Sequence, residues 1–402
     1  MDICLLDYQS TSAAGNNLDE LRTALAQQRS GLRANDFPRS DLSTWIGRVS
    51  TVDDIDLGEW QSRNNALAHI GISQGTILDN IEQLKSRFSA PRIGVVMGSS
   101  TSSIDRTETA YTDLTDDGML KPVFQQESVH NPHAPSLYVA HVTGITGPAL
   151  TINTACSSSA KVFATGARWL KSGIVDAVLV GGVDTLCLSV LHGFDSLQLI
   201  SQNPCRPFDQ DRDGINLGEA AGFAILVRKE DSHKTTGIEL LGYGESSDAY
   251  HMSHPHPDGL GAKLSMEQAL LIAELSPESI DYINLHGTSS RANDSIEGQL
   301  INQLFPKTTR CSSTKAWMGH TLGAAGITEA IIALDTIHTG LIPGSMNLST
   351  LDDGIDISIQ AENVEQTVNF AMTNSFGFGG NNCSLVFGRE NMPKQAKTGD
   401  QV

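Results

Sequence analysis

Short apolar runs alternate along most of the chain with longer segments that have the spacing and composition of helices. Four of the five clearest apolar runs end or begin at glycines, as buried strands often do. This alternation predicts an α/β protein with buried strands. The predicted strands are 92–97, 176–180, 221–227, 282–285 and 383–387, and the predicted helices are 18–28, 160–170, 263–274 and 326–338.

A dense polar connection, 228–236 (RKEDSHKTT), divides the chain a little past its middle. We place a domain boundary there, between an N-terminal half, 1–235, and a C-terminal half, 236–390. Residues 391–402 are expected to form a solvated tail.

Two segments suggest an internal duplication. Cys156 opens a Ser/Ala-rich segment that becomes a helix pattern ending at Gly173, and His320 opens a Gly/Ala-rich segment that does the same up to Gly340. Each segment has a reactive residue at the start of a helix. The residue identities are too dissimilar to establish the duplication from sequence.

Composition excludes several classes of protein. The 402 residues include 27 Lys and Arg against 46 Asp and Glu, a formal charge of −19, and no long basic run, so nucleic acid is not an expected partner. No apolar run approaches the roughly 20 residues of a membrane span, and the first residues lack a basic leader, which predicts a cytoplasmic protein. The six cysteines lie far apart. Neither a disulfide framework, a metal site nor a redox cofactor is expected.

One cysteine lies in a context that favours chemistry. In 151–159 (TINTACSSS), a β-branched run is followed by Cys156 and then by three serines that enter a helix pattern. Backbone N–H groups and the helix dipole at such a turn predict a lowered pKa and a thiolate that needs no adjacent base. The alternative is a buried cysteine acting as a small hydrophobe, which we favour for Cys187, Cys205 and Cys311.

Two of the histidines also stand apart. His286 follows the strand-like run 281–285 and precedes 287–290 (GTSS), and strand ends in α/β sheets present groups to a ligand crevice. His320 lies in 315–326 (KAWMGHTLGAAG), where small neighbours let a ligand approach its ring. For each, a hydrogen-bonded core histidine is the alternative.

Two glycine-containing segments remain. The first, 374–382 (NSFGFGGNN), has three glycines around two phenylalanines, and such a loop can turn backbone N–H groups toward an anion or simply form a tight turn. The second, 206–222 (RPFDQDRDGINLGEAAG), lacks the ligand spacing of an EF-hand, and we interpret it as a buried, salt-bridged turn.

In order and spacing, these motifs resemble the β-ketoacyl-acyl carrier protein synthases of types I and II. The resemblance rests on TACSSS around Cys156, HGTSS from His286, KAWMGH from Lys315 to His320, and FGFGG over 376–380, and it covers about 1–390. It implies an α/β fold of the thiolase-like kind, with five αβαβα layers built from two pseudo-symmetric βαβ-rich halves. It also implies a dimer through the first half.

The resemblance further implies a decarboxylating Claisen condensation. An acyl chain would pass to Cys156 and be attacked by a carbanion from malonyl carrier protein. The backbone N–H groups of Cys156 and Phe378 would hold the oxyanion, and His286 and His320 would each donate an Nε2–H to the malonyl thioester carbonyl. Lys315 would support the histidines.

Other parts of the motifs imply contacts with the substrate. Thr288 and Ser290 would bind the phosphopantetheine arm, which the carrier protein brings with it, so no separate cofactor is expected. Phe376 and Phe378 belong to the loop that would gate the acyl pocket. The sequence departs from the family pattern at Ser290, where a threonine is usual, and in GGNN, where the family has GGTN.

A subgroup is indicated by a short 194–208 segment together with 63–68 (RNNALA) and 98–104 (GSSTSSI), which resemble synthases of bacterial aryl-polyene clusters. That implies an aromatic, conjugated acyl chain and allows a heterodimer with a Cys-less chain-length subunit instead of a homodimer. An acidic carrier protein would need a local basic patch on this acidic chain. Arg63, Lys121 and Arg206 are candidates, and each fits a solvated surface charge equally well.

Rival functions fit the residues less well. Thiolases use a second cysteine in the C-terminal glycine loop, and type III synthases pair the cysteine with His and Asn. A non-catalytic chain-length subunit would lack the active cysteine. A cysteine hydrolase would want a base beside the thiol and would not need two histidine donors. The choice between fatty acid and aryl-polyene synthesis stays open.

Overall fold

The computed structural model describes residues 2–126, 128–231 and 235–393, and within them ten strands form one sheet that divides into two halves of five. The first half has the order β5-β4-β6-β8-β1 and the second has the order β11-β10-β14-β15-β9. The halves meet where Cys4 on β1 pairs with Glu239 on β9. The strands are β1 (Ile3–Ser12), β4 (Ile93–Gly98), β5 (Ala149–Ile152), β6 (Ala177–Asp184), β8 (Ala220–Arg228), β9 (Ile238–Ser247), β10 (Tyr282–Asn284), β11 (Arg310–Ser312), β14 (Phe370–Gly377) and β15 (Asn381–Arg389).

Both halves have the same topology. In the first, β4 runs parallel to β5 and β6, and β8 runs antiparallel to β6 and β1. In the second, β10 runs parallel to β11 and β14, and β15 runs antiparallel to β14 and β9. The repeated order supports the internal duplication that the sequence suggests. All five predicted strands are confirmed.

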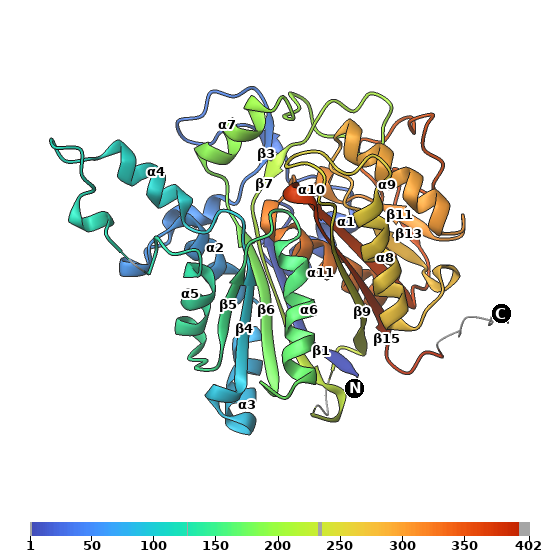
Figure 1. Ribbon diagram of the computed structural model, residues 1–402, viewed down its shortest axis with the longest axis horizontal. Coiled ribbons are helices and arrows are strands. Elements are labelled where there is room, and N and C mark those ends of the chain that lie inside the picture. The colour runs from blue at the N-terminus through green and yellow to red at the C-terminus, as the bar shows by residue number, and fades with distance from the viewer. Residues whose placement is uncertain (1, 127, 232–234, 394–402) are drawn as a thin grey trace.

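Helices complete a five-layer arrangement (Figure 1). α6 (Ser158–Lys171) and α11 (Ala325–Thr339) pack against each other between the two halves of the sheet. α2 (Arg63–Ile72), α3 (Ile77–Phe88) and α5 (Ala134–Thr143) cover the outer face of the first half. α8 (Leu260–Ala273) and α9 (Arg291–Leu304) cover that of the second. The αβαβα architecture expected from the resemblance is therefore confirmed.

The middle layer explains the composition of α11. Every residue from Ala325 to Ile337 is buried, because a helix between two sheets has no face toward water. A Cβ at Gly326 would lie 2.4 Å from the backbone nitrogen of Ala160, so only glycine lets α11 approach α6 this closely. This close packing brings the starts of the two central helices together.

The remaining elements lie around this core. Residues 104–125, which include α4, project from the body as an arm (Figure 1). The domain boundary between 235 and 236 remains a prediction, and residues 394–402 of the predicted tail lie outside the described residues. In the described ranges, no helix has the length and apolarity to cross a bilayer. The other helices are α1 (Leu18–Ala26), α4 (Ile104–Thr112), α7 (Leu188–Ser196) and α10 (Lys315–Met318), and two small sheets contain β2 (Arg33–Ala34), β3 (Trp45–Gly47) and β7 (Leu217–Gly218), and β12 (Leu341–Ile342) and β13 (Val364–Glu365).

Candidate active site

Cys156 lies on the predicted turn between strand and helix. It follows β5, precedes α6, and is only 6% exposed. The preceding residue, Ala155, has a φ of +51°, a left-handed conformation that is costly for a residue with a Cβ. This strained elbow turns the thiol into the space between the two halves of the sheet.

The environment of the thiol differs from the expectation. Burial raises the pKa of Cys156 to about 11, because loss of solvation outweighs the favourable Lys315 charge and a hydrogen bond from the backbone of Phe378. The predicted lowering of this pKa is therefore wrong. An imidazole lies beside the thiol, with Nε2 of His320 at 3.0 Å from Sγ, and the expectation that the thiol needs no adjacent base remains a prediction.

His286 is fixed by hydrogen bonds just beyond β10. Its backbone N–H and that of Gly287 donate to the two carboxylate oxygens of Glu297, each at 2.8 Å. Its ring meets the ring of His320 edge-on, with centroids 5.5 Å apart. Burial and the Lys315 charge hold the pKa of both imidazoles well below 6.5, so each ring is neutral and has one N–H donor.

Lys315 is buried behind the histidines. Its Nζ donates to the carbonyl oxygen of His286 and to the carboxylate of Glu329. Burial raises the pKa of Glu329 to about 7, against the lowering effect of Lys315. The ion pair links α10 to α11, and the hydrogen bond to the His286 carbonyl links both to the segment that carries His286. The supporting role of Lys315 remains a prediction.

The glycine-rich loop comes into close contact with the nucleophile. A Cβ at Gly377 would lie 2.8 Å from the carbonyl oxygen of Thr154 and 3.2 Å from the nitrogen of Cys156, so glycine is required there. The next residue, Phe378, directs its backbone N–H toward the thiol. The ring of Phe378 packs near that of Phe194, with the two ring centroids 5.6 Å apart. The loop therefore places a backbone N–H beside the nucleophile, and its role in binding an anion remains a prediction.

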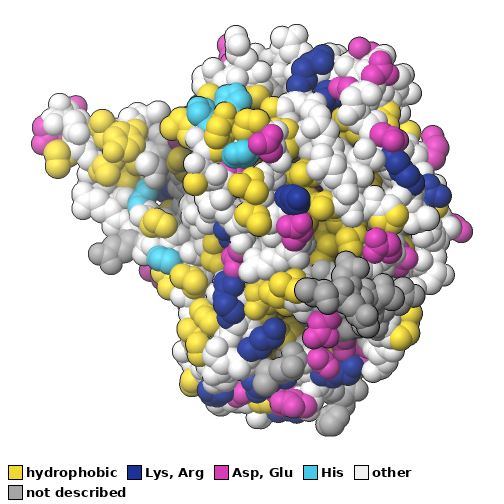
Figure 2. All heavy atoms as spheres, turned by 45° about the vertical axis from the view of Figure 1, so that its right-hand side comes forward, with side chains coloured by type: hydrophobic (Ala, Val, Ile, Leu, Met, Phe, Trp, Pro, Cys, Tyr) yellow, Lys and Arg dark blue, Asp and Glu magenta, His cyan; other side chains and the backbone are white. Residues whose placement is uncertain are grey.

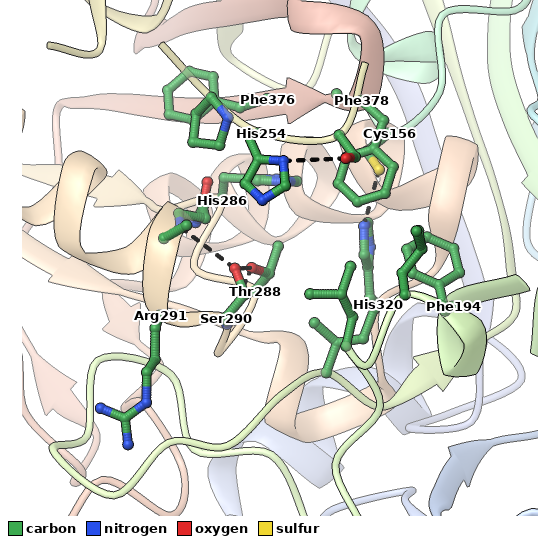
Figure 3. A pocket seen from close by; sticks show the side chains of 18 of the residues that line it. Cys156, Phe194, His254, His286, Thr288, Ser290, Arg291, His320, Phe376 and Phe378 are labelled. Atoms are coloured by element: carbon green, nitrogen blue, oxygen red, sulfur yellow. Dashed lines mark hydrogen bonds between the residues drawn. The ribbon is translucent and has the colours of Figure 1, made fainter. Parts of the chain in front are cut away.

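A cavity of about 380 Å³ joins these groups (Figure 3). The hydroxyls of Thr288 and Ser290 lie 2.9 Å apart in the same cavity. Seven of the residues predicted from sequence line it: Cys156, His286, Thr288, Ser290, His320, Phe376 and Phe378.

Comparisons with known proteins agree with this geometry. Residues 9–232 match the family described as "Beta-ketoacyl synthase, N-terminal domain", and residues 238–349 match "Beta-ketoacyl synthase, C-terminal domain". The chain belongs to the β-ketoacyl synthase family.

Individual relatives cover almost the whole chain. A "3-oxoacyl-[acyl-carrier-protein] synthase 2" from Vibrio harveyi is 33% identical over 401 residues, which cover 94% of this chain and 95% of the relative. A solved chain of "Ketosynthase (ApeO) in Complex with its Chain Length Factor (ApeC) from Xenorhabdus doucetiae" is 36% identical, with a TM-score of 0.85. The match covers 96% of this chain and 98% of the solved one. A chain of "The ishigamide ketosynthase/chain length factor" is 25% identical, with a TM-score of 0.88, and the match covers 97% of this chain and 99% of the solved one.

Three further residues of this β-ketoacyl synthase line the cavity and were not found from sequence. Phe194 opens the 194–208 segment noted in the sequence, but none of Phe194, His254 and Arg291 was predicted as a site residue, and the fold brings all three to the cavity. His254 lies on a loop over the site, where its Nδ1 is 3.1 Å from Nδ1 of His251. The same loop accepts a hydrogen bond from the N–H of Gly379 at the carbonyl of Met252 (2.7 Å).

The proposed basic patch is not assembled. Arg63 is 11% exposed and pairs with Glu219 and Asp53 at 2.5 Å, so its guanidinium is unavailable to a carrier protein, and that prediction is wrong. Lys121 pairs with Asp113 on the projecting arm. Arg206 is half-buried and, like the other two, does not line the cavity. Figure 2 shows Lys and Arg interspersed with Asp and Glu over the face in view.

The segment 206–222 is the buried, salt-bridged turn that the sequence predicts. Arg212 is 1% exposed and pairs with Asp352 at 2.6 Å and with Asp294 at 3.8 Å. Asp294 also accepts a hydrogen bond from the N–H of Ser289. The turn thus supports the loop that carries Thr288 and Ser290.

The donor atoms of Cys156, His286 and His320 all lie within 4.8 Å of one another. Thiolate and imidazole are also ligands for zinc, so this set is chemically able to bind a soft metal. The expectation that the protein uses neither a metal nor a separate cofactor remains a prediction.

Proposed function

We propose that this protein is a β-ketoacyl-acyl carrier protein synthase that transfers an acyl chain to Cys156 and condenses it with malonyl carrier protein. The observation that carries the proposal is the buried contact of 3.0 Å between the Cys156 thiol and Nε2 of His320, with the ring of His286 beside it. Relatives named 3-oxoacyl-[acyl-carrier-protein] synthase 2 support the substrate class.

The first step is a thioester exchange. Sγ of Cys156 attacks the acyl carbonyl carbon, and the bond from that carbon to the carrier's sulfur breaks. Because the raised pKa keeps the resting thiol protonated, its proton passes to solvent as Sγ attacks, and the departing carrier thiolate takes a proton from solvent. His320, whose Nε2 lies 3.0 Å from Sγ, keeps its Nε2–H for the second step. The N–H groups of Cys156 and Phe378 stabilise the oxyanion.

The second step forms the new carbon–carbon bond. Malonyl thioester loses CO₂, and Nε2–H donors from His286 and His320 stabilise the enolate oxygen. The enolate carbon then attacks the acyl carbon on Cys156, the C–Sγ bond breaks, and the thiolate takes a proton from solvent. Neutral imidazoles suit this step because each keeps an N–H to donate. Thr288 and Ser290 hold the phosphopantetheine arm.

The proposal extends to the partner and the acyl chain. Structural relatives named as ketosynthases with chain length factors support a heterodimer. In the described residues β5 is an edge strand of the first half, which suits a dimer formed through that half. The resemblance to aryl-polyene synthases favours an aromatic, conjugated acyl chain, with saturated fatty acyl chains as the alternative. The three catalytic side chains argue against a non-catalytic chain-length subunit.

Intact-protein mass spectrometry tests this function. The protein is incubated with saturated, unsaturated and aromatic acyl carrier proteins, alone and with a candidate partner chain, and C156A is the control. We expect a mass increase equal to the acyl group in the wild type only, with the preferred donor identifying the pathway. Absence of an adduct with every donor and partner would overturn the proposal and favour the chain-length role.

A further inference from the structure

Arg291 lies at the outer part of the active-site cavity. It is the first residue of α9, it is exposed, and it follows Ser290 directly. In Figure 3, Thr288 and Ser290 lie between Cys156 and Arg291, whose guanidinium points away from the thiol. Among the described residues that line this cavity, Arg291 is the one Lys or Arg side chain.

The charge of Arg291 is not neutralised by an ion pair with any acid in the described part of the chain. The nearby carboxylates of Asp294 and Asp352 pair with Arg212, at 3.8 Å and 2.6 Å. The pKa of Asp352 is lowered mainly by a hydrogen bond from the backbone of Gly354 and by Arg212, and the Arg291 charge makes a smaller contribution. The guanidinium is therefore open to a ligand from solvent.

The two acids in the described lining of the cavity, Asp213 and Asp248, accept hydrogen bonds from other groups of the protein. Asp213 accepts a hydrogen bond from the hydroxyl of Ser201 at 2.7 Å. Asp248 accepts one from Nδ2 of Asn382 at 2.8 Å and one from the backbone N–H of His256 at 3.1 Å. These hydrogen bonds hold the two carboxylates in place, and Arg291 is the cationic side chain in the described lining that can pair with an anion.

We propose that Arg291 binds the phosphodiester of the carrier protein's phosphopantetheine arm, an inference that rests on the proposed function. The thioester end of the arm must reach Cys156, and its amide-bearing middle passes Thr288 and Ser290. The phosphodiester at the other end then lies toward Arg291. A guanidinium donates two parallel N–H groups to phosphate oxygens, so it suits this group.

This contact accounts for carrier recognition on an acidic protein. The chain has a formal charge of −19, and the guanidinium of Arg63 is paired with Glu219 and Asp53. A single arginine aimed at the prosthetic arm recognises a group that every carrier protein shares. It does so without a broad basic surface.

The test compares two minimal donors that differ only in phosphate, acyl-phosphopantetheine and acyl-pantetheine, in the acylation of Cys156. The proteins are the wild type, R291Q and R291K. The control K263Q removes the same charge from the partly exposed Lys263 on α8, which does not line the cavity. Rates are measured by intact mass over a range of donor concentrations.

We expect the wild type and K263Q to prefer the phosphorylated donor by about tenfold or more, as for loss of a charged hydrogen bond. R291Q should lose this preference through a higher KM, with partial rescue in R291K. An unchanged preference in R291Q would overturn the assignment, as would equal KM values of the wild type and R291Q for acyl carrier protein measured in the same way. No acylation of the wild type by any donor would overturn the proposed function, and this inference with it.

Discussion

The thiol of Cys156 and Nε2 of His320 lie 3.0 Å apart although 164 positions separate them in the chain. Cys156 precedes α6 in the first half of the molecule, and His320 comes shortly before α11 in the second. Because α6 and α11 pack together in the middle layer, the repeated topology brings one reactive group from each half into a single cavity. The catalytic proposal depends on this juxtaposition.

The reactivity of Cys156 should rise with pH well beyond the range of a free cysteine. Burial raises its pKa to about 11, so the thiolate fraction is small at neutral pH and grows as pH approaches that value. We expect the rate of alkylation of Cys156 by iodoacetamide, followed by peptide mass spectrometry, to increase continuously from pH 7 to pH 10. A plateau reached below pH 8 would show a lowered pKa and contradict this account.

Decarboxylation of malonyl carrier protein should not depend on pH near 6.5. Burial and Lys315 hold the pKa of His286 and His320 well below that value, so both rings stay neutral from there upward and protonate only in more acidic solution. CO₂ release by C156A, which separates this step from acyl transfer, should be constant from pH 6.5 to 8. In H286A and in H320A the rate of CO₂ release should fall by about 100-fold or more. An inflection near 6.5 would contradict the neutral pair.

Replacing Lys315 should destabilise the fold as well as the site. K315M leaves Glu329 buried without its cation, and breaking a buried ion pair costs about 3–5 kcal/mol. Without Lys315 the pKa of Glu329 rises further, so the folded state retains a proton that the unfolded state releases, and stability falls as pH rises. Urea unfolding should show a larger loss at pH 8 than at pH 5.5.

The double variant K315M/E329Q is the control for that measurement. It removes the uncompensated carboxyl, so it should recover much of the stability and lose the added pH dependence. A double variant as unstable at pH 8 as K315M would assign the loss to packing instead of charge.

Glu297 should matter through the position of His286. E297A leaves the N–H groups of His286 and Gly287 buried and unpaired, at a cost of about 1–3 kcal/mol for each. We expect lower stability in urea and a lower kcat for decarboxylation, with acylation of Cys156 less affected. E297Q keeps one acceptor oxygen, so its stability and its kcat should lie between those of the wild type and those of E297A. Equal loss of acylation and decarboxylation would indicate general unfolding instead.

Part of this structure could be predicted from sequence because the relevant signals are local. Apolar runs, four of the five next to glycines, indicated the strands of 92–97, 176–180, 221–227, 282–285 and 383–387, and motif order indicated which side chains share the cavity. The paired helix starts at Cys156 and His320 likewise suggested the duplication.

The errors came from long-range packing. The pKa of Cys156 depends on how completely the second half buries it, and the turn sequence carries no such information. Arg63 reads as a surface charge, yet its partner Glu219 lies 156 positions away and only the fold reveals the pair. Arg291 belongs to no motif, so its place in the cavity emerged only from the start of α9.

The central claim is that Cys156 and the two histidines carry out condensation in two steps. Its most direct test incubates acylated protein with malonyl carrier protein labelled with ¹³C at the free carboxylate, and measures the carrier-bound product and the released CO₂. We expect an acyl chain longer by two carbons on the carrier, one labelled CO₂ for each product, and free Cys156. Labelled CO₂ without chain extension, or release of the acyl group as a free acid, would contradict the account.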